Sequence, residues 1–295
     1  MSVSRLLTAI VLFAADPALA ASPELEVVPS TARPGDAVLV ALKGTLERCP
    51  SGEIGGREFK FFRFGEHCRA VVGLPVEQQP GELEIRAEGL EASLEVLPPN
   101  FNERSLTVAA KYVEPPASVR KRMRDDQMAF ARAYAQPFVN EARFLKNFEL
   151  PVRSQMTAPF GDLRLYNGKK QSQHYGMDLD GKVGDPVVAA NDGVVVMARD
   201  NYASGQTVLL HHGGDLYTAY FHLSEIGVKK GATVKRGEQV GRVGKTGRVT
   251  GPHLHWGVKV GGLYVDPSSL LRIDFEGARS SAPASGVRRV RDAGR

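Results

Sequence analysis

Two short histidine motifs constrain the fold of this chain more than any other feature of its sequence. The first runs from His174 to Asp178, and the second reads His253-Leu254-His255. Gly176 disfavours a helix through the first motif, because glycine costs a helix interior about 1 kcal/mol. Both motifs therefore predict extended strands, in which side chains two positions apart share a face.

Each predicted strand has a polar face and an apolar face. His174 and Asp178 would share one face of the first strand, and His253 and His255 one face of the second. The opposite faces are apolar and predict packing into a core. The apolar residues are Met177, Leu179, Leu254 and Trp256.

Imidazole and carboxylate groups gathered in this way predict a metal site. A catalytic zinc takes three protein ligands of these types and leaves one position for water. The two motifs offer four such side chains, and His222 in the segment 220–224 offers a fifth. Five candidates for three positions would leave two histidines free for chemistry. His211-His212, which precedes two glycines, instead predicts structural histidines at a strand end.

The order of these motifs resembles that of the M23 peptidases. These lysostaphin or LytM-type enzymes are zinc endopeptidases that cut peptide bonds in bacterial peptidoglycan. The similarity covers residues 148–272 and includes His-x-x-x-Asp, Tyr-x-His-Leu-Ser and His-Leu-His-Trp-Gly. A frame of glycine-containing segments accompanies them, at 158–161, 193–195, 231–234, 241, 244 and 251–253. The resemblance implies an antiparallel β domain of LytM type over residues 148–272.

The resemblance also implies a role for each of the five side chains. His174, Asp178 and His255 match the family's three zinc ligands, so one Zn²⁺ per chain is expected. His222 and His253 match two active-site histidines that do not bind the metal. They would take a proton from the attacking water and stabilise the oxyanion. The sequence does not decide which of the two is the general base.

The expected function is hydrolysis of peptide bonds in peptidoglycan, either in cross-links or in stem peptides. One alternative is a non-catalytic LytM-type module that binds cell wall and activates another hydrolase, as family members lacking ligands do. A second is a peptidase of the same type that acts on protein, such as a glycine-rich substrate. Segment 234–241 also resembles the hairpins of lipoyl carriers, but the modified lysine of such carriers is not evident.

The first 20 residues predict a signal peptide, and therefore an exported protein of the periplasm or the extracellular space. Arg5 precedes a short apolar run over 6–15, and Ala18-Leu19-Ala20 matches a small-x-small cleavage site. The run is shorter than the roughly 20 apolar residues that a membrane span needs. No other segment predicts a transmembrane helix.

The two cysteines of the chain, Cys49 and Cys68, fit an exported protein. An oxidising compartment predicts a disulfide between them. In the chain-entropy model, closing a loop of this size contributes about 3 kcal/mol. The alternative is a metal pair with His67, which lacks a second pair of ligands to complete a site.

The length of 295 residues, with 42% apolar side chains, predicts two modest domains. The many short strands along both of them predict a mostly β fold. Residues 24–97 predict a small Ig-like β-sandwich, because short alternating strands such as 83–87 are separated by Pro and Gly turns. No chemistry is visible in this domain, and its phenylalanines predict a core. They are Phe59, Phe61, Phe62 and Phe64.

Residues 98–147 predict a linker with a helix over about 116–135, whose many charges predict a solvated face and no nucleic-acid partner. Two roles stay open for the sandwich and helix: positioning the enzyme on an envelope protein partner, or covering its groove. Residues 276–295, with five arginines against two acids, predict a disordered basic tail. The net charge of +5 is compatible with an anionic cell wall as partner.

Overall fold

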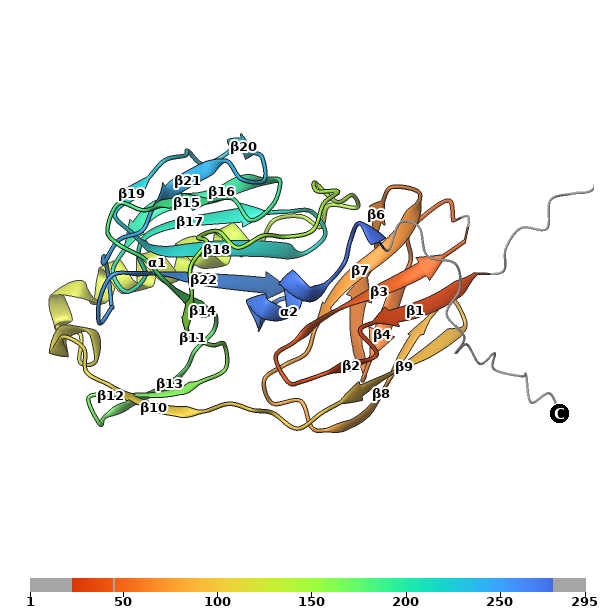
Figure 1. Ribbon diagram of the computed structural model, residues 1–295, viewed down its shortest axis with the longest axis horizontal. Helices are drawn as coiled ribbons and strands as arrows, with labels where there is room; N and C mark the ends of the chain where they lie inside the picture. The colour runs from red at the N-terminus through yellow and green to blue at the C-terminus, as the bar shows by residue number, and fades with distance from the viewer. Residues whose placement is uncertain (1–22, 45, 278–295) are drawn as a thin grey trace, which may run out of the picture.

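The computed structural model describes residues 23–44 and 46–277. The predicted signal peptide and most of the predicted basic tail therefore lie outside the described residues. The fold is mostly β, as predicted, with two β domains joined by a long connecting segment (Figure 1). None of the helices in the described part of the chain is long and apolar enough to cross a membrane.

Two sheets make up the N-terminal domain. Its strands are β1 (Glu24–Val28), β2 (Thr31–Ala32), β3 (Ala37–Lys43), β4 (Ser51–Ile54), β5 (Arg57–Lys60), β6 (Phe62–Phe64), β7 (His67–Gly73), β8 (Gly81–Ala87) and β9 (Leu90–Val96). One sheet has the order β1-β3-β7-β6 and the other β2-β9-β8-β4-β5. Val38 and Val40 of the first sheet share a buried cluster with Ile54, Ile85 and Leu94 of the second. The Ig-like character of this domain stays a prediction.

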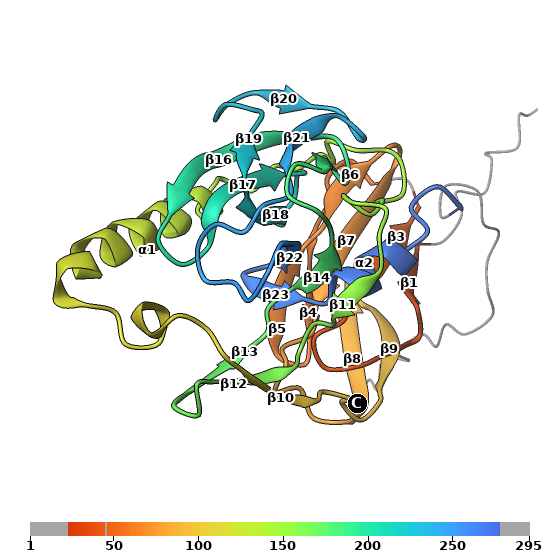
Figure 2. The same ribbon diagram turned by 60° about the vertical axis from the view of Figure 1, so that its left-hand side comes forward.

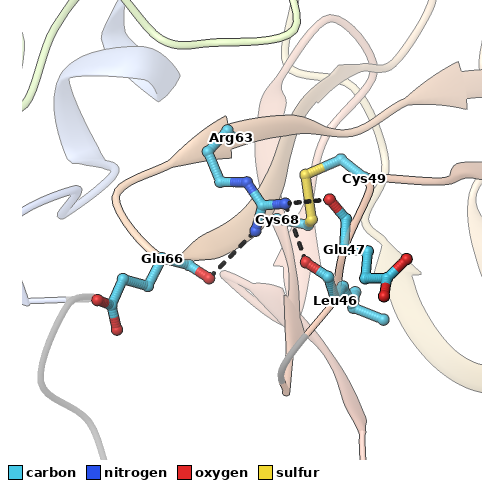
Figure 3. Close-up of a disulfide and its surroundings, with 6 residues drawn as sticks. All are labelled: Leu46, Glu47, Cys49, Arg63, Glu66 and Cys68. Carbon is cyan, nitrogen blue, oxygen red and sulfur yellow. Dashed lines mark hydrogen bonds between the residues drawn. A yellow bond between two sulfur atoms is a disulfide. The ribbon is translucent and has the colours of Figure 1, made fainter.

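A disulfide joins Cys49, which precedes β4, to Cys68 of β7 (Figure 3). Beside it, Arg63 donates hydrogen bonds from Nη2 to the carbonyl oxygens of Leu46 and Glu47, at 2.9 and 3.1 Å. The disulfide and the guanidinium therefore fix the same loop to the β6–β7 hairpin.

The connecting segment packs on the C-terminal domain. It contains β10 (Glu103–Leu106), two 3-10 turns, η1 (Ala110–Tyr112) and η2 (Ala117–Val119), and α1 (Arg120–Tyr134), which together with η2 is the predicted helix. Ala129 and Ala133 lie four residues apart on α1 and pack against Val196 and Leu209. The buried carboxylate of Asp126 accepts hydrogen bonds from Arg199 Nη2 and from the Tyr202 backbone, both at 2.7 Å.

The C-terminal domain is built on an eight-stranded sheet. Its strands are β11 (Met156–Ala158), β14 (Met177–Asp180), β16 (Gly193–Asn201), β17 (Gly205–His211), β18 (Leu216–Leu223), β20 (Thr233–Val234), β22 (His253–Val260) and β23 (Leu263–Val265). The order is β11-β14-β22-β18-β17-β16-β20, and β23 pairs with β22. The central strand β18 is buried along its whole length, which its almost continuous apolar sequence explains.

Two three-stranded sheets complete this domain. One contains β15 (Pro186–Val188), β21 (Gln239–Arg242) and β19 (Glu225–Ile226), in that order. The other contains β10, β12 (Leu163–Tyr166) and β13 (Lys170–Gln173), and lies below the main sheet in the views of Figures 1 and 2. The β10–β12 pair is parallel, and β10 comes from the connecting segment, outside residues 148–272 for which an antiparallel domain was predicted.

The apolar core of the C-terminal domain continues into the N-terminal domain. Phe64 belongs to the same buried cluster as Phe144 and Phe275. Its ring centroid lies 5.6 Å from that of Phe144 and 6.0 Å from that of Phe275. The two domains therefore share a core, and the short helix α2 (Pro267–Arg272) lies between them (Figure 1).

Candidate active site

The five predicted side chains come together at one end of β14, β18 and β22. Asp178 lies on β14, directly opposite His255 of β22 in the antiparallel register. His222 lies near the end of β18, and His253 begins β22. The structure thus brings together residues that are 81 positions apart in the sequence, such as His174 and His255.

The polar and apolar faces of β22 are as predicted. Leu254 and Trp256 are fully buried in the core, while His253 and His255 face the site. Met177 and Leu179 of β14 are buried in the same core. The apolar side of the two motifs therefore anchors the histidines and the aspartate.

The prediction of a strand through His174 is wrong. The strand β14 begins only at Met177, and His174 lies in the preceding connection. The backbone of His174 is hydrogen-bonded elsewhere, since its N–H donates to Asp162 and its carbonyl accepts from Gly161, both at 2.9 Å. Gly176 passes so close to the His255 ring that a Cβ atom there would lie 2.6 Å from Nε2. This close approach explains the glycine.

His174, Asp178 and His255 present ligand atoms that all lie within 4.8 Å of one another. Oδ1 of Asp178 lies 3.0 Å from Nε2 of His174 and 2.7 Å from Nδ1 of His255. The two ring nitrogens are 3.0 Å apart. Two imidazole nitrogens and a carboxylate oxygen that converge on one point are the donor set of a three-ligand zinc site. The residues present therefore fit a metal.

Burial and hydrogen bonds set the protonation states of these groups. Burial lowers the pKa of His255 to about 4, although the Asp178 carboxylate partly opposes this shift. Burial alone would raise the pKa of Asp178, but hydrogen bonds to His174 and His255 outweigh it and hold this pKa well below its usual range. Neutral imidazole and ionised carboxylate are the forms that bind a metal.

The tautomer of His174 is fixed by its surroundings. Its Nδ1 lies 2.6 Å from the carbonyl oxygen of Pro159, which can only accept a hydrogen bond. Nδ1 therefore carries the proton, and Nε2 directs its lone pair to the cluster. A carbonyl that orients a ligand histidine in this way is typical of metal sites.

His222 and His253 lie beside the cluster, and their ring centroids are 5.2 Å apart. Nδ1 of His222 lies 2.8 Å from the carbonyl oxygen of Thr246, and Nδ1 of His253 lies 2.9 Å from that of Gly251. Each ring therefore uses Nδ1 as a donor and keeps Nε2 as its basic nitrogen. Burial, and the neighbouring charges that His255 and His253 can carry, lower the pKa of His222 well below its usual value.

The backbone of His222 adopts a left-handed conformation, with φ of 62°, which is uncommon outside glycine. Its N–H donates to the carbonyl of Ser204 at 2.9 Å, which fixes this geometry. Strained residues of this kind cluster at functional sites.

Arg164 completes the surroundings of Asp178 and was missed by the sequence reasoning. Its Nη2 donates to Oδ2 of Asp178 at 2.7 Å, and both side chains are largely buried. The signal for it in the sequence is its place in the short segment 163–166, where the arginine stands between two leucines in a strand-like alternation.

A groove of about 450 Å³ contains the site. Its lining includes the five predicted side chains and residues of β10, β12 and the connection 248–252.

The prediction that His211 and His212 are structural residues agrees with their geometry, since both are buried. His212 Nε2 lies 2.8 Å from Thr218 Oγ1, and His211 Nε2 lies 3.0 Å from the carbonyl of Gly214.

Comparison with known proteins agrees with this geometry. Residues 172–267 match peptidase family M23. The C-terminal domain belongs to the M23 peptidases. The matched segment contains all five predicted site residues, from His174 to His255.

Relatives of the M23 domain are named peptidoglycan DD-endopeptidases or metalloproteases. The peptidoglycan DD-endopeptidase ShyA of Vibrio cholerae is 40% identical over 125 residues, which are 42% of this chain and 29% of ShyA. An uncharacterized metalloprotease of Haemophilus influenzae is 34% identical over 173 residues, or 57% of this chain and 36% of that protein. The chain thus matches only about a third of the length of these relatives.

A solved structure resembles most of the chain. A Pseudomonas aeruginosa protein assigned to peptidase M23 superimposes with a TM-score of 0.62 at 29% identity. The similarity covers 81% of this chain and 94% of that one. The likeness therefore extends beyond the M23 domain.

Proposed function

We propose that this protein is an exported zinc endopeptidase that hydrolyses peptide bonds of peptidoglycan. One observation carries the proposal: three metal-binding side chains and two further histidines converge in one groove of an M23 domain. The substrate class rests on relatives such as ShyA, which is named a peptidoglycan DD-endopeptidase. The exported location rests on the signal-like sequence of residues 1–20.

His174, Asp178 and His255 would hold the zinc. A zinc ion supplies Lewis-acid chemistry, because it polarises a carbonyl oxygen and lowers the pKa of water to about 7. Asp178 stays ionised and offsets part of the metal charge, and Arg164 holds its second oxygen in place. The imidazoles of His174 and His255 provide nitrogen lone pairs.

His222 and His253 handle the proton and the developing charge. Each has its Nδ1 hydrogen-bonded to a carbonyl, so Nε2 is the nitrogen that can take a proton from water. Once protonated, either ring becomes a donor that stabilises an oxyanion next to the cluster. The rings of His222 and His253 are neighbours, with centroids 5.2 Å apart, so one can act as base while the other donates.

Digestion of purified peptidoglycan tests the proposal. The full chain, with its zinc content measured, should release soluble fragments whose masses show hydrolysis of a peptide bond. A chelator should abolish the release, and added zinc should restore it. Zinc-loaded protein that binds the wall without releasing fragments would instead support a non-catalytic activator. Cleavage of a glycine-rich protein alone would support a peptidase of different substrate class.

The location is tested separately. Mature protein isolated from cells should begin at Ala21 and be recovered from the envelope or the medium. Full-length protein beginning at Met1 in the cytoplasm would contradict export.

A further inference from the structure

One wall of the groove is the three-stranded sheet β10-β12-β13. Arg104 of β10 is the register partner of Arg164 on β12, and Leu106 is the partner of Tyr166. Residues two apart on a strand share a face. All four of these residues line the groove, so this face of the sheet points into it. The wall therefore presents two arginines, with an aromatic ring at the Tyr166 end.

Both arginines of this wall have an acidic partner. Nε of Arg104 lies 2.5 Å from Oδ2 of Asp162, and Nη2 of Arg164 lies 2.7 Å from Oδ2 of Asp178. Their charges are thus balanced within the protein. A third arginine, Arg248, reaches the same groove from the connection between β21 and β22.

Arg248 differs from the other two. Its guanidinium carbon lies 4.7 Å from the centroid of the Tyr166 ring, so the charged group rests over the ring. Within residues 23–44 and 46–277, its side chain forms no hydrogen bond or ion pair with an acidic or carbonyl group. Contact with a ring face leaves the N–H donors at the edge of the guanidinium plane available to a ligand.

The backbone of Arg248 is held firmly. Its N–H donates to the carbonyl of Ala203 at 2.7 Å. The preceding Gly247 has φ of 78°, and a Cβ atom there would lie 2.5 Å from the same carbonyl oxygen. The connection therefore packs against the segment at 203–205, and the donors of Arg248 are positioned before any ligand arrives.

We propose that Arg248 binds a carboxylate of the substrate peptide. The planar fork of a guanidinium matches the two oxygens of a carboxylate, and the Tyr166 ring holds the fork in place. The inference rests on the proposed function, because the peptide lies in the groove that holds the cluster. Arg104 and Arg164 are paired with Asp162 and Asp178, so among the described residues of the groove Arg248 is the arginine left to pair with an anionic group of the peptide.

Two substrates that differ only in charge provide the test. One is a cross-linked peptidoglycan fragment with free peptide carboxylates, and the other is the same fragment with those carboxylates converted to primary amides. The wild-type protein should cleave the first with a kcat/KM higher by about tenfold, since a hydrogen bond from a guanidinium to a carboxylate is stronger than one to a neutral amide. Arg248→Gln should reduce this ratio to about one, and Arg248→Lys should give an intermediate ratio.

A matched control comes from the same connection. Lys245 is exposed and does not line the groove, so Lys245→Gln removes one positive charge and should keep the wild-type ratio. The thermal midpoint of each variant reports whether it is folded. If Arg248→Gln slows both substrates equally, Arg248 only supports the groove and the proposal is wrong. An equal rate for the two substrates in the wild type would contradict it as well.

Failure of the proposed function would look different. If the wild type cleaves neither fragment, the assignment as an enzyme fails. Calorimetry of the binding of the two fragments then tests separately whether Arg248 binds a carboxylate. Tighter binding of the carboxylate form, lost in Arg248→Gln and kept in Lys245→Gln, would support the carboxylate site. Equal binding of both forms would remove it.

Discussion

Arg164 and Asp178 form a buried ion pair in which the guanidinium holds Oδ2 of the carboxylate, the oxygen turned away from the histidines. Oδ1 is left to face His174 and His255, and the three contacts together fix the plane of the carboxylate. Groups that orient a metal ligand in this way affect metal affinity without touching the metal.

The first prediction concerns this pair. Arg164→Ala should weaken zinc binding by about 10-fold to 100-fold, because Asp178 loses the contact that orients it. Competition with a chelator of known affinity measures the change. Arg104→Ala is the control, since Arg104 lies beside Arg164 in the register but pairs with Asp162. Equal losses of zinc affinity in both variants would mean that the arginine charge near the site, and not the orientation of Asp178, sets that affinity.

The second prediction separates ligands from proton carriers. Substitution of His174, Asp178 or His255 by Ala should remove zinc and activity together, since two ligands rarely hold a catalytic zinc. His222→Ala and His253→Ala should keep the zinc but lose about 10²–10⁴ in kcat. Elemental analysis and peptidoglycan hydrolysis on the same five proteins test the division. Zinc loss in either of the last two variants would reassign that residue as a ligand.

The third prediction concerns the disulfide. Cys49→Ala with Cys68→Ala should lower the free energy of unfolding by about 3 kcal/mol, because the bridge spans a sequence separation of 19 residues. Hydrolysis should be little changed in the folded variant, since the bridge lies in the N-terminal domain. Urea unfolding measures the stability, and the chemically reduced wild type is the control for the substitutions. Thiol labelling of denatured, unreduced wild type should find no free thiol.

The fourth prediction concerns acid stability. Burial lowers the pKa of His212 to about 4, so between pH 6.5 and about 4 the unfolded chain binds a proton there that the folded protein does not. Stability should therefore fall as the pH drops through this window, by about 1.4 kcal/mol per pH unit for this one proton. Urea unfolding of wild type and His212→Gln should give a shallower pH dependence in the variant. If the unfolding free energies of the two proteins fall equally with pH, His212 contributes nothing to the loss of stability in acid.

The fifth prediction concerns the shared core. A chain that starts at Phe148 lacks Phe64 and Phe144, and so exposes the side of Phe275 that they cover. We expect this fragment to be less soluble and to unfold at lower temperature than the full chain. The full chain should unfold in one transition seen by both fluorescence and circular dichroism. Two separated transitions would show that the domains are stable independently.

The sequence predicted the strands and faces that depend on local alternation. Leu254 and Trp256 could be placed in the core because they alternate with His253 and His255 over a regular strand. His174 could not be placed correctly, because its backbone pairs with Gly161 and Asp162, and a local pattern carries no information about that contact. Arg164 was missed for the same reason, since its role depends on a neighbouring strand.

The prediction of a connecting linker also missed a strand. Glu103–Leu106 pairs in parallel with β12, where Arg104 is the partner of Arg164, 60 positions later in the sequence. No local feature of residues 98–107 identifies so distant a partner. The helix was easier to predict, because α1 is formed by good helix formers after a proline-rich start. Which domain this helix contacts became known only from its packing on β16 and β17.

Because β10 pairs with β12, the groove is built from more of the chain than the segment that matches the M23 family. The segment that matches peptidase family M23 begins at residue 172, whereas Arg104, Arg164 and Tyr166 come before that point and still form a wall of the groove. Enzymes with matching M23 segments can therefore differ in this wall. An alignment confined to the matched segment would compare the five site residues while leaving out Arg104, Arg164 and Tyr166 of the groove wall.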